Sequence, residues 1–372
     1  MYKLGLIINP FAGIGGRAGL KGSDGVEIQQ QALASGFTSQ AQERVCLALE
    51  TLTSIQDKVK ILTYPSEMGA DAARRTGFKT IELGRIESGA TTAEDTITAA
   101  LIMKDAGVDL ILFAGGDGTA RNVCTAVGDE VPVLGIPCGV KMHSSVYAIT
   151  PRRAGEICRD FLEREDKLLV DGEVMDLDEA TYRTGAVTAK LYGYLKVPEA
   201  GELMQKRKSG SGYSQGNQLN LLGMLYADRM ESNVLYIIGP GSTTSYVMKD
   251  LGLDNTLLGV DLIADKKLVA SDVNEVQIWN TMQRYPKTEI IATVIGGQGH
   301  LFGRGNQQIS PRIIRKVGRE NIHVIASKQK LVDLYPRPFL VDTGDPILDE
   351  SLCGYIRVPQ SRTQDVTYKV GR

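Results

Sequence analysis

Asp117 is the residue of this sequence best suited to chemistry, because it lies in Gly115-Gly116-Asp117-Gly118-Thr119 directly after the apolar run 108–114 (VDLILFA). Glycines let backbone N–H groups come close to phosphate oxygens, and the N-terminus of a following helix adds positive charge. A carboxylate held there can accept the proton of a hydroxyl group that attacks a phosphoryl group. The pattern therefore predicts a phosphate-binding loop with Asp117 as a base. The alternative is structural: Asp117 caps the next helix in a tight turn.

Glycine is enriched, at 41 of 372 residues, against a usual share of about 7%. Much of it follows apolar runs, as in Gly13-x-Gly15-x-x-Ala18, which fits the letter of a dinucleotide-binding fingerprint. That fingerprint requires a helix that opens at once and an acidic residue about 20 positions later. Gly19, Gly22 and Gly25 instead extend the loop. We therefore expect a loop that faces phosphate or substrate, or a plain surface loop, rather than a Rossmann turn.

The segments that must position these loops alternate between two patterns. Short apolar runs at 2–9, 108–114 and 131–136 are typical of buried strands, and helical segments are predicted at 41–51, 92–106, 119–127 and 151–163. This alternation predicts an α/β domain with a mostly parallel sheet over residues 1–165. The pattern turns strand-like near Lys167, which predicts a β-rich domain over 166–335. Residues 336–372 are expected to form a tail that packs back on the first domain.

The overall composition excludes several classes of protein. Lys and Arg number 42 and Asp and Glu number 44, which gives no support for a nucleic-acid binder. Five cysteines without a C-x-x-C pair and three scattered histidines argue against a disulfide framework or a zinc site. The sequence has no apolar run of about 18 residues, so no membrane span is expected. The N-terminus shows no signal-peptide pattern, so we expect a cytoplasmic protein without a membrane partner.

Four segments together resemble a known kinase superfamily. The sequence 115–119 (GGDGT) is similar to the hallmark shared by NAD kinases, diacylglycerol and sphingosine kinases, and phosphofructokinases, and 9–13 (NPFAG) resembles the start of such kinases. The segment 239–246 (GPGSTTSY) resembles the Thr-Gly-Ser-Thr-Ala-Tyr segment of NAD kinases. The run 135–144 (GIPCGVKMHS) looks like the ATP-NAD kinase-like branch that includes acetoin-catabolism protein X. The resemblance spans roughly the first 260 residues.

The resemblance implies an α/β domain followed by a β-rich domain, with a kinase site. The implied reaction converts ATP and NAD to NADP and ADP, with Mg²⁺ bound to the nucleotide phosphates rather than in an all-protein metal site. Asp117 would deprotonate the acceptor hydroxyl. Related kinases are often homo-oligomers, and the implied partners are small nucleotides. The residues expected to bind nucleotide are Gly115, Gly116, Gly118, Thr119, Asn122, Gly241, Ser242, Thr243 and Tyr246.

Other side chains are weaker candidates. Asn9, Lys141 and Arg121 are candidate phosphate contacts, although a solvated Lys and a surface Arg are the plainer interpretations. His143 is either a donor to substrate or a packed histidine. Asp176 or Asp178 would be acidic partners. The basic segment 206–208 (KRK) lies in a polar loop that would be either a lid over phosphates or simply solvated.

The sequence departs from the NAD kinase pattern in the second motif. Pro240 replaces a Thr, and Thr244-Ser245 occupies the place of a single Ala. These departures leave two alternatives open. One is a kinase of another alcohol or of a lipid, and the other is a nucleotide-binding regulatory protein with little catalysis.

Overall fold

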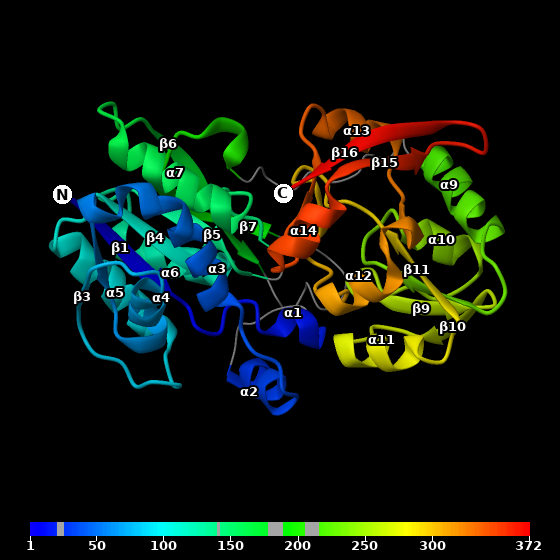
Figure 1. Ribbon diagram of the computed structural model, residues 1–372, viewed down its shortest axis with the longest axis horizontal. Coiled ribbons are helices and arrows are strands. Elements are labelled where there is room, and N and C mark those ends of the chain that lie inside the picture. The colour runs from blue at the N-terminus through cyan, green and yellow to red at the C-terminus, as the bar shows by residue number, and fades with distance from the viewer. Residues whose placement is uncertain (21–25, 140–141, 178–188, 205–215) are drawn as a thin grey trace. The chain divides into compact units, whose positions relative to one another are not determined.

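The computed structural model describes residues 1–20, 26–139, 142–177, 189–204 and 216–372. It divides into two compact units (Figure 1). Unit 1 comprises Met1–Ile14 and Gly22–Arg207, and unit 2 comprises Gly15–Lys21 and Lys208–Arg372. Each unit has its own hydrophobic core.

Unit 1 is built on one parallel sheet of five strands in the order β3-β2-β1-β4-β5. The side chains of β4 are buried along its whole length, which explains its unbroken apolar sequence. The predicted parallel α/β domain is therefore confirmed. The strands are β1 (Tyr2–Ile8), β2 (Val59–Thr63), β3 (Thr80–Glu82), β4 (Leu110–Gly115) and β5 (Val133–Pro137).

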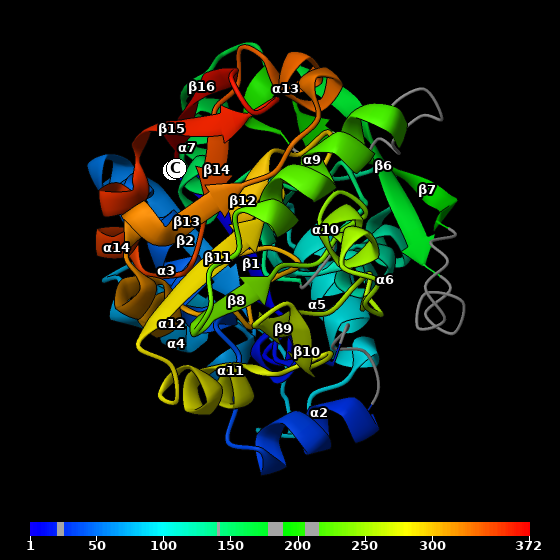
Figure 2. The ribbon, with the colours of Figure 1, turned by 90° about the vertical axis from the view of Figure 1, so that its right-hand side faces the viewer.

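Two helix pairs cover this sheet on opposite faces (Figure 2). Helices α3 and α7 pack together on one face, and α5 and α6 pack together on the other. Short helical segments fill the connections. The helices of unit 1 are α2 (Val26–Ala34), α3 (Ala41–Leu49), α4 (Ala70–Arg75), α5 (Ala93–Asp105), α6 (Asp117–Val127) and α7 (Pro151–Glu163), and the 3₁₀ segments are η1 (Glu50–Lys58), η2 (Ser66–Met68) and η3 (Gly201–Leu203).

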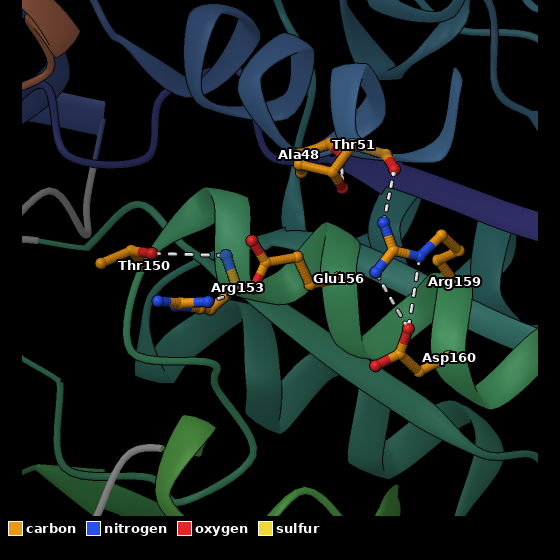
Figure 3. Close-up of polar contacts among 7 residues, drawn as sticks. All are labelled: Ala48, Thr51, Thr150, Arg153, Glu156, Arg159 and Asp160. Carbon is orange, nitrogen blue, oxygen red and sulfur yellow. Dashed lines mark hydrogen bonds and ion pairs between the residues drawn. The ribbon is translucent and has the colours of Figure 1, made fainter. Parts of the chain in front are cut away.

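Helix α7 shows how local sequence fixes one of these elements (Figure 3). Thr150 is its N-cap, and its hydroxyl accepts a hydrogen bond of 3.3 Å from the backbone N–H of Arg153. Pro151 occupies the first helical position, where no N–H is needed. Arg159 Nη1 donates to the carbonyl of Thr51 at 3.5 Å, which ties α7 to η1.

An antiparallel hairpin completes unit 1 and moves the expected domain boundary. Strands β6 (Leu169–Leu177) and β7 (Ala189–Pro198) pair with each other and pack against α6 and β5. Residues 166–207 therefore belong to unit 1, so the boundary lies near Arg207 rather than near residue 165. The strand-like composition of this segment signals a hairpin of the first unit, not the start of the second.

Unit 2 is strand-rich, as predicted, and its two sheets are mixed. The first has the order β10-β9-β8-β11-β13, in which β8, β11 and β13 are parallel and β9 and β10 are antiparallel to their neighbours. The second has the order β12-β14-β16-β15. The strands are β8 (Val234–Ile238), β9 (Asp261–Ala264), β10 (Lys267–Ala270), β11 (Lys287–Ala292), β12 (His300–Phe302), β13 (Ile322–Val324), β14 (Phe339–Val341), β15 (Gly354–Pro359) and β16 (Asp365–Gly371).

The expected tail is an integral part of unit 2. Strand β16 pairs with β14 and β15, and Tyr368 stacks on Phe339 with ring centroids 4.2 Å apart. Residues 336–372 thus belong to unit 2 and contribute to one of its cores. The helices of this unit are α1 (Gly15–Ala18), α9 (Gly216–Asp228), α10 (Ser245–Asp250), α11 (Glu275–Met282), α12 (Pro311–Val317), α13 (Lys328–Leu334) and α14 (Pro346–Leu352), with the 3₁₀ segment η5 (Arg319–Asn321).

Within the described ranges, no helix is both long enough and apolar enough to cross a membrane.

Candidate active site

The candidate site lies where the strand order of unit 1 reverses. From β1 the chain moves outward to β2 and β3, and it then returns to β4 and β5 on the other side of β1. Ligands of open α/β sheets bind outside the carboxyl ends of the strands at such a reversal. The loops that start at Asn9 and at Gly116 leave the adjacent strands β1 and β4 at this point.

Asn9 joins these two loops. Its side-chain Nδ2 donates to Thr119 Oγ1 at 3.1 Å, and its Oδ1 accepts from the backbone N–H of Phe11 at 3.1 Å. Thr119 is buried, with 2% of its surface exposed. Both predicted site residues are thus brought together, and the hydrogen bond between them links the two loops.

The loops after β4 and β5 touch through their backbones. Gly115 O accepts from the N–H groups of Cys138 and Gly139 at 2.9 and 3.0 Å. A Cβ atom on Gly139 would lie 2.9 Å from the Cα of Gly116, closer than real Cβ atoms come to other atoms. These glycines are therefore required by loop packing as well as by any phosphate that approaches them.

Asp117 is the first residue of α6 and is 8% exposed. Its Oδ2 accepts from the backbone N–H of His143 at 2.8 Å, and its Oδ1 accepts from that of Ser144 at 3.0 Å. Hydrogen bonds to an ionised carboxylate are stronger than those between neutral groups. The helix N-terminus adds further stabilisation of negative charge. The fold therefore holds a buried carboxylate, with both oxygens hydrogen-bonded, at the strand reversal.

The segment that donates to Asp117 is itself fixed by the β6–β7 hairpin and by β5. Ser144 Oγ accepts from the backbone N–H of Met175 at 2.9 Å, and Ser145 Oγ accepts from that of Glu173 at 2.8 Å. Tyr147 Oη donates to the carbonyl of Gly116 at 2.5 Å. Sequence reasoning missed these contributions, because the partners lie about 30 positions apart without a shared motif.

Two other predicted residues lie farther along α6. Arg121 forms an ion pair with Asp176 of β6, one of the two acidic residues considered in the sequence. Its guanidinium is thus engaged in joining α6 to the hairpin. Asn122 is half-buried on the same helix. Three other predictions, Lys141, Asp178 and the basic segment 206–208, lie outside the described residues.

Unit 2 carries the second predicted motif at the carboxyl end of β8. Gly241 has a φ of +131°, which a side chain rarely tolerates. The hydroxyl of Thr244 is 2.7 Å from Gly239 O and 2.8 Å from Gly241 O. Thr244, at the departure from the NAD kinase pattern, therefore folds the loop on itself. Ser242 is exposed and Tyr246 half-buried.

Lys330 is a contributor to this loop that sequence reasoning missed. Its Nζ donates to Thr243 Oγ1 at 2.9 Å, to Thr293 Oγ1 at 3.1 Å and to Val294 O at 3.2 Å. Thr243 is only 3% exposed. Lys330 thus fastens the 239–246 loop to the end of β11. No local signal marks it, since its partner Thr243 is 87 positions away.

Comparison with known families agrees with this geometry. Residues 4–166 match the ATP-NAD kinase N-terminal domain, and residues 231–370 match the ATP-NAD kinase C-terminal domain. The first match contains the Asn9 and Asp117 loops, and the second contains the 239–246 loop and Lys330. No curated protein matches the chain closely enough to count as a relative. The two domain matches occur in family order and cover most of the sequence, and the chain belongs to the ATP-NAD kinase family.

Proposed function

We propose that this protein transfers the γ-phosphoryl group of ATP to a hydroxyl group of NAD, with NADP and ADP as products. Membership of the ATP-NAD kinase family supports a kinase reaction. The observation that carries the proposal is Asp117, a buried carboxylate at the N-terminus of α6 and at the reversal of strand order.

Asp117 supplies the negative charge that helps the acceptor hydroxyl lose its proton as the new P–O bond forms. The N–H groups at the start of α6, around Gly115, Gly116 and Gly118, are suited to phosphate oxygens because a helix N-terminus attracts anions. Mg²⁺ enters as part of the MgATP substrate and neutralises phosphate charge. In the described part of the chain, no group of three or more His, Cys, Asp or Glu side chains is suited to hold a metal ion.

The 239–246 loop of unit 2 is proposed to contact nucleotide through Gly241, Ser242, Thr243 and Tyr246. Ser242 is the strongest of these candidates because it is exposed, whereas the hydroxyl of Thr243 already accepts from Lys330. A relation to acetoin catabolism and assembly into homo-oligomers stay predictions.

The test is to incubate the purified protein with ATP, Mg²⁺ and NAD and to measure NADP. Asp117→Asn is the diagnostic variant, because the amide has the shape of the carboxylate but cannot carry its charge. Asp171→Asn is a matched control, since Asp171 pairs with Lys196 on the β6–β7 hairpin at 2.8 Å. We expect NADP from the wild type and the control, and a loss of about 10²–10⁴-fold in Asp117→Asn.

Each negative outcome separates one of the alternatives. A phosphorylated product from another alcohol or a lipid, but not from NAD, would keep the kinase and replace the acceptor. A thermal shift with ATP and no product from a panel of hydroxyl compounds would favour a regulatory nucleotide-binding protein. Full activity of Asp117→Asn would refute the role of its carboxylate.

A further inference from the structure

The imidazole of His143 is an unusual buried group beside the candidate site. The residue is only 6% exposed, and neither ring nitrogen has a hydrogen-bond partner among the described residues. Buried polar atoms are nearly always paired, so an unpaired one needs an explanation. A histidine kept for packing alone would be expected to bond at least one nitrogen.

The ring lies next to the carboxylate of Asp117. His143 Nδ1 is 3.5 Å from Asp117 Oδ2, slightly too long for a hydrogen bond. Catalytic hydrogen bonds are often long before substrate binds and shorten in the complex. Nε2, the other ring nitrogen, is also buried and has no hydrogen-bond partner among the described residues.

The backbone around His143 holds this arrangement rigidly. The N–H of His143 itself donates to Asp117, and the next residue, Ser144, both donates to Asp117 and accepts from Met175. Ser144 is fully buried. The imidazole is therefore presented by a fixed segment rather than by a free loop.

We propose that His143 is a catalytic residue that takes the proton of the acceptor hydroxyl, with Asp117 as its charge partner. The inference rests on the proposed function and refines it. Both oxygens of Asp117 already accept backbone N–H bonds, whereas Nε2 of His143 accepts none. The geometry therefore gives the imidazole the freer lone pair and gives the carboxylate the role of stabilising the imidazolium.

In the proposed step, the acceptor oxygen forms a bond to the γ-phosphorus while its proton moves to Nε2 of His143. The bond from the γ-phosphorus to the bridging oxygen breaks, and its electron pair leaves with ADP. The imidazolium then loses its proton to solvent, which restores the neutral ring and releases one proton for each phosphoryl group transferred.

The experiment compares His143→Gln, His143→Ala and His323→Gln with the wild type in NADP formation. Glutamine is similar in size but cannot take up the proton, and alanine leaves space for free imidazole. His323 is a matched control on β13 whose ring bonds Glu289. We expect a fall in kcat of about 10²–10⁴-fold for both His143 variants. We expect little change in KM for ATP, partial rescue of His143→Ala by added imidazole, and no effect in the control.

The outcomes separate this inference from the proposed function. A wild type that makes no phosphorylated product from any acceptor overturns the proposed function, and the role of His143 with it. An active wild type with an equally active His143→Gln overturns the role of His143 alone. A slow His143→Ala that imidazole does not restore, or a loss confined to KM, also overturns it, because either result indicates a structural role.

Discussion

Replacing Gly135 by alanine tests whether the packing of Tyr147 stabilises the loop that carries Asp117. A Cβ atom at residue 135 would lie 2.2 Å from Cδ1 of the Tyr147 ring. The ring cannot move into solvent, because Tyr147 is fully buried and packs edge-on against Phe113 at 5.4 Å. The substitution must therefore displace the ring or β5.

The expected cost follows from two contributions. Overpacking of a close-packed core costs about 1–3 kcal/mol. The displaced ring also loses the bond from Tyr147 Oη to Gly116 O, which adds about 1 kcal/mol. We expect Gly135→Ala to lower the stability of unit 1 by about 2–4 kcal/mol. Because Gly116 precedes Asp117, we also expect phosphoryl transfer to fall at least about tenfold.

The assay combines urea unfolding followed by circular dichroism with hydrogen exchange of residues 142–148. A double-mutant cycle with Tyr147→Ala isolates the clash, because removing the ring removes the strain. The two changes together should cost less than their sum by about 1–3 kcal/mol. Gly239→Ala is the control, since its Cβ would meet only ordinary contacts at 3.4 Å and beyond. A stability change below about 0.5 kcal/mol for Gly135→Ala, or full additivity in the cycle, would refute the reasoning.

Two further predictions concern unit 2. A hydrogen bond from His323 holds the pKa of the Glu289 carboxyl below its ordinary value. The Glu289 carboxylate therefore stabilises the fold above the unfolded-state pKa of about 4.3, and this stabilisation is lost as the pH falls through the folded-state pKa. Between about pH 6 and pH 3, the free energy of unfolding should therefore fall less in Glu289→Gln than in the wild type, as measured by the fluorescence of the single Trp279. Lys330→Met removes the ammonium group that donates to the hydroxyls of Thr243 and Thr293. We expect the 239–246 loop to become less ordered, the KM for nucleotide to rise and the stability of unit 2 to fall by about 1–3 kcal/mol.

Each of these has a clear contrary result. An equal loss of stability on acidification in Glu289→Gln and wild type would show that this carboxylate is not a source of the pH dependence. An unchanged KM in Lys330→Met would show that the order of the Thr243 loop does not matter for nucleotide binding. Lys316→Met, a change on α12 with no ion pair among the described residues, is the control for loss of a lysine charge in unit 2.

The parallel sheet of unit 1 was predictable because most of its strands, such as β4 and β5, are buried on both faces. Such strands have continuous apolar sequences, as in 108–114, and segments with a helical pattern follow them. Strand β16 was not predictable in this way. Its buried residues alternate with exposed ones, and its partner β14 lies more than 20 positions earlier. The segment 336–372 consequently looks like a tail, although it completes a sheet.

The candidate site was predicted only in part, for a similar reason. Asp117 and its glycines form a local motif, so their chemistry can be proposed from spacing alone. The contacts from Ser144, Tyr147 and Lys330 arise from chain segments that only the fold brings near their partners. The sequence also suggested phosphate as the reason for the glycines. The structure adds a second reason, because the backbones of Gly116 and Gly139 touch.

The most direct test of the account is NADP formation from ATP, Mg²⁺ and NAD by the wild type and by Asp117→Asn, measured side by side. The account predicts steady formation of NADP by the wild type and a fall of about 10²–10⁴-fold in the variant, with binding of ATP retained in a thermal-shift assay. Equal rates for the two proteins, or no phosphoryl transfer by the wild type to NAD or to any other hydroxyl compound, would contradict it.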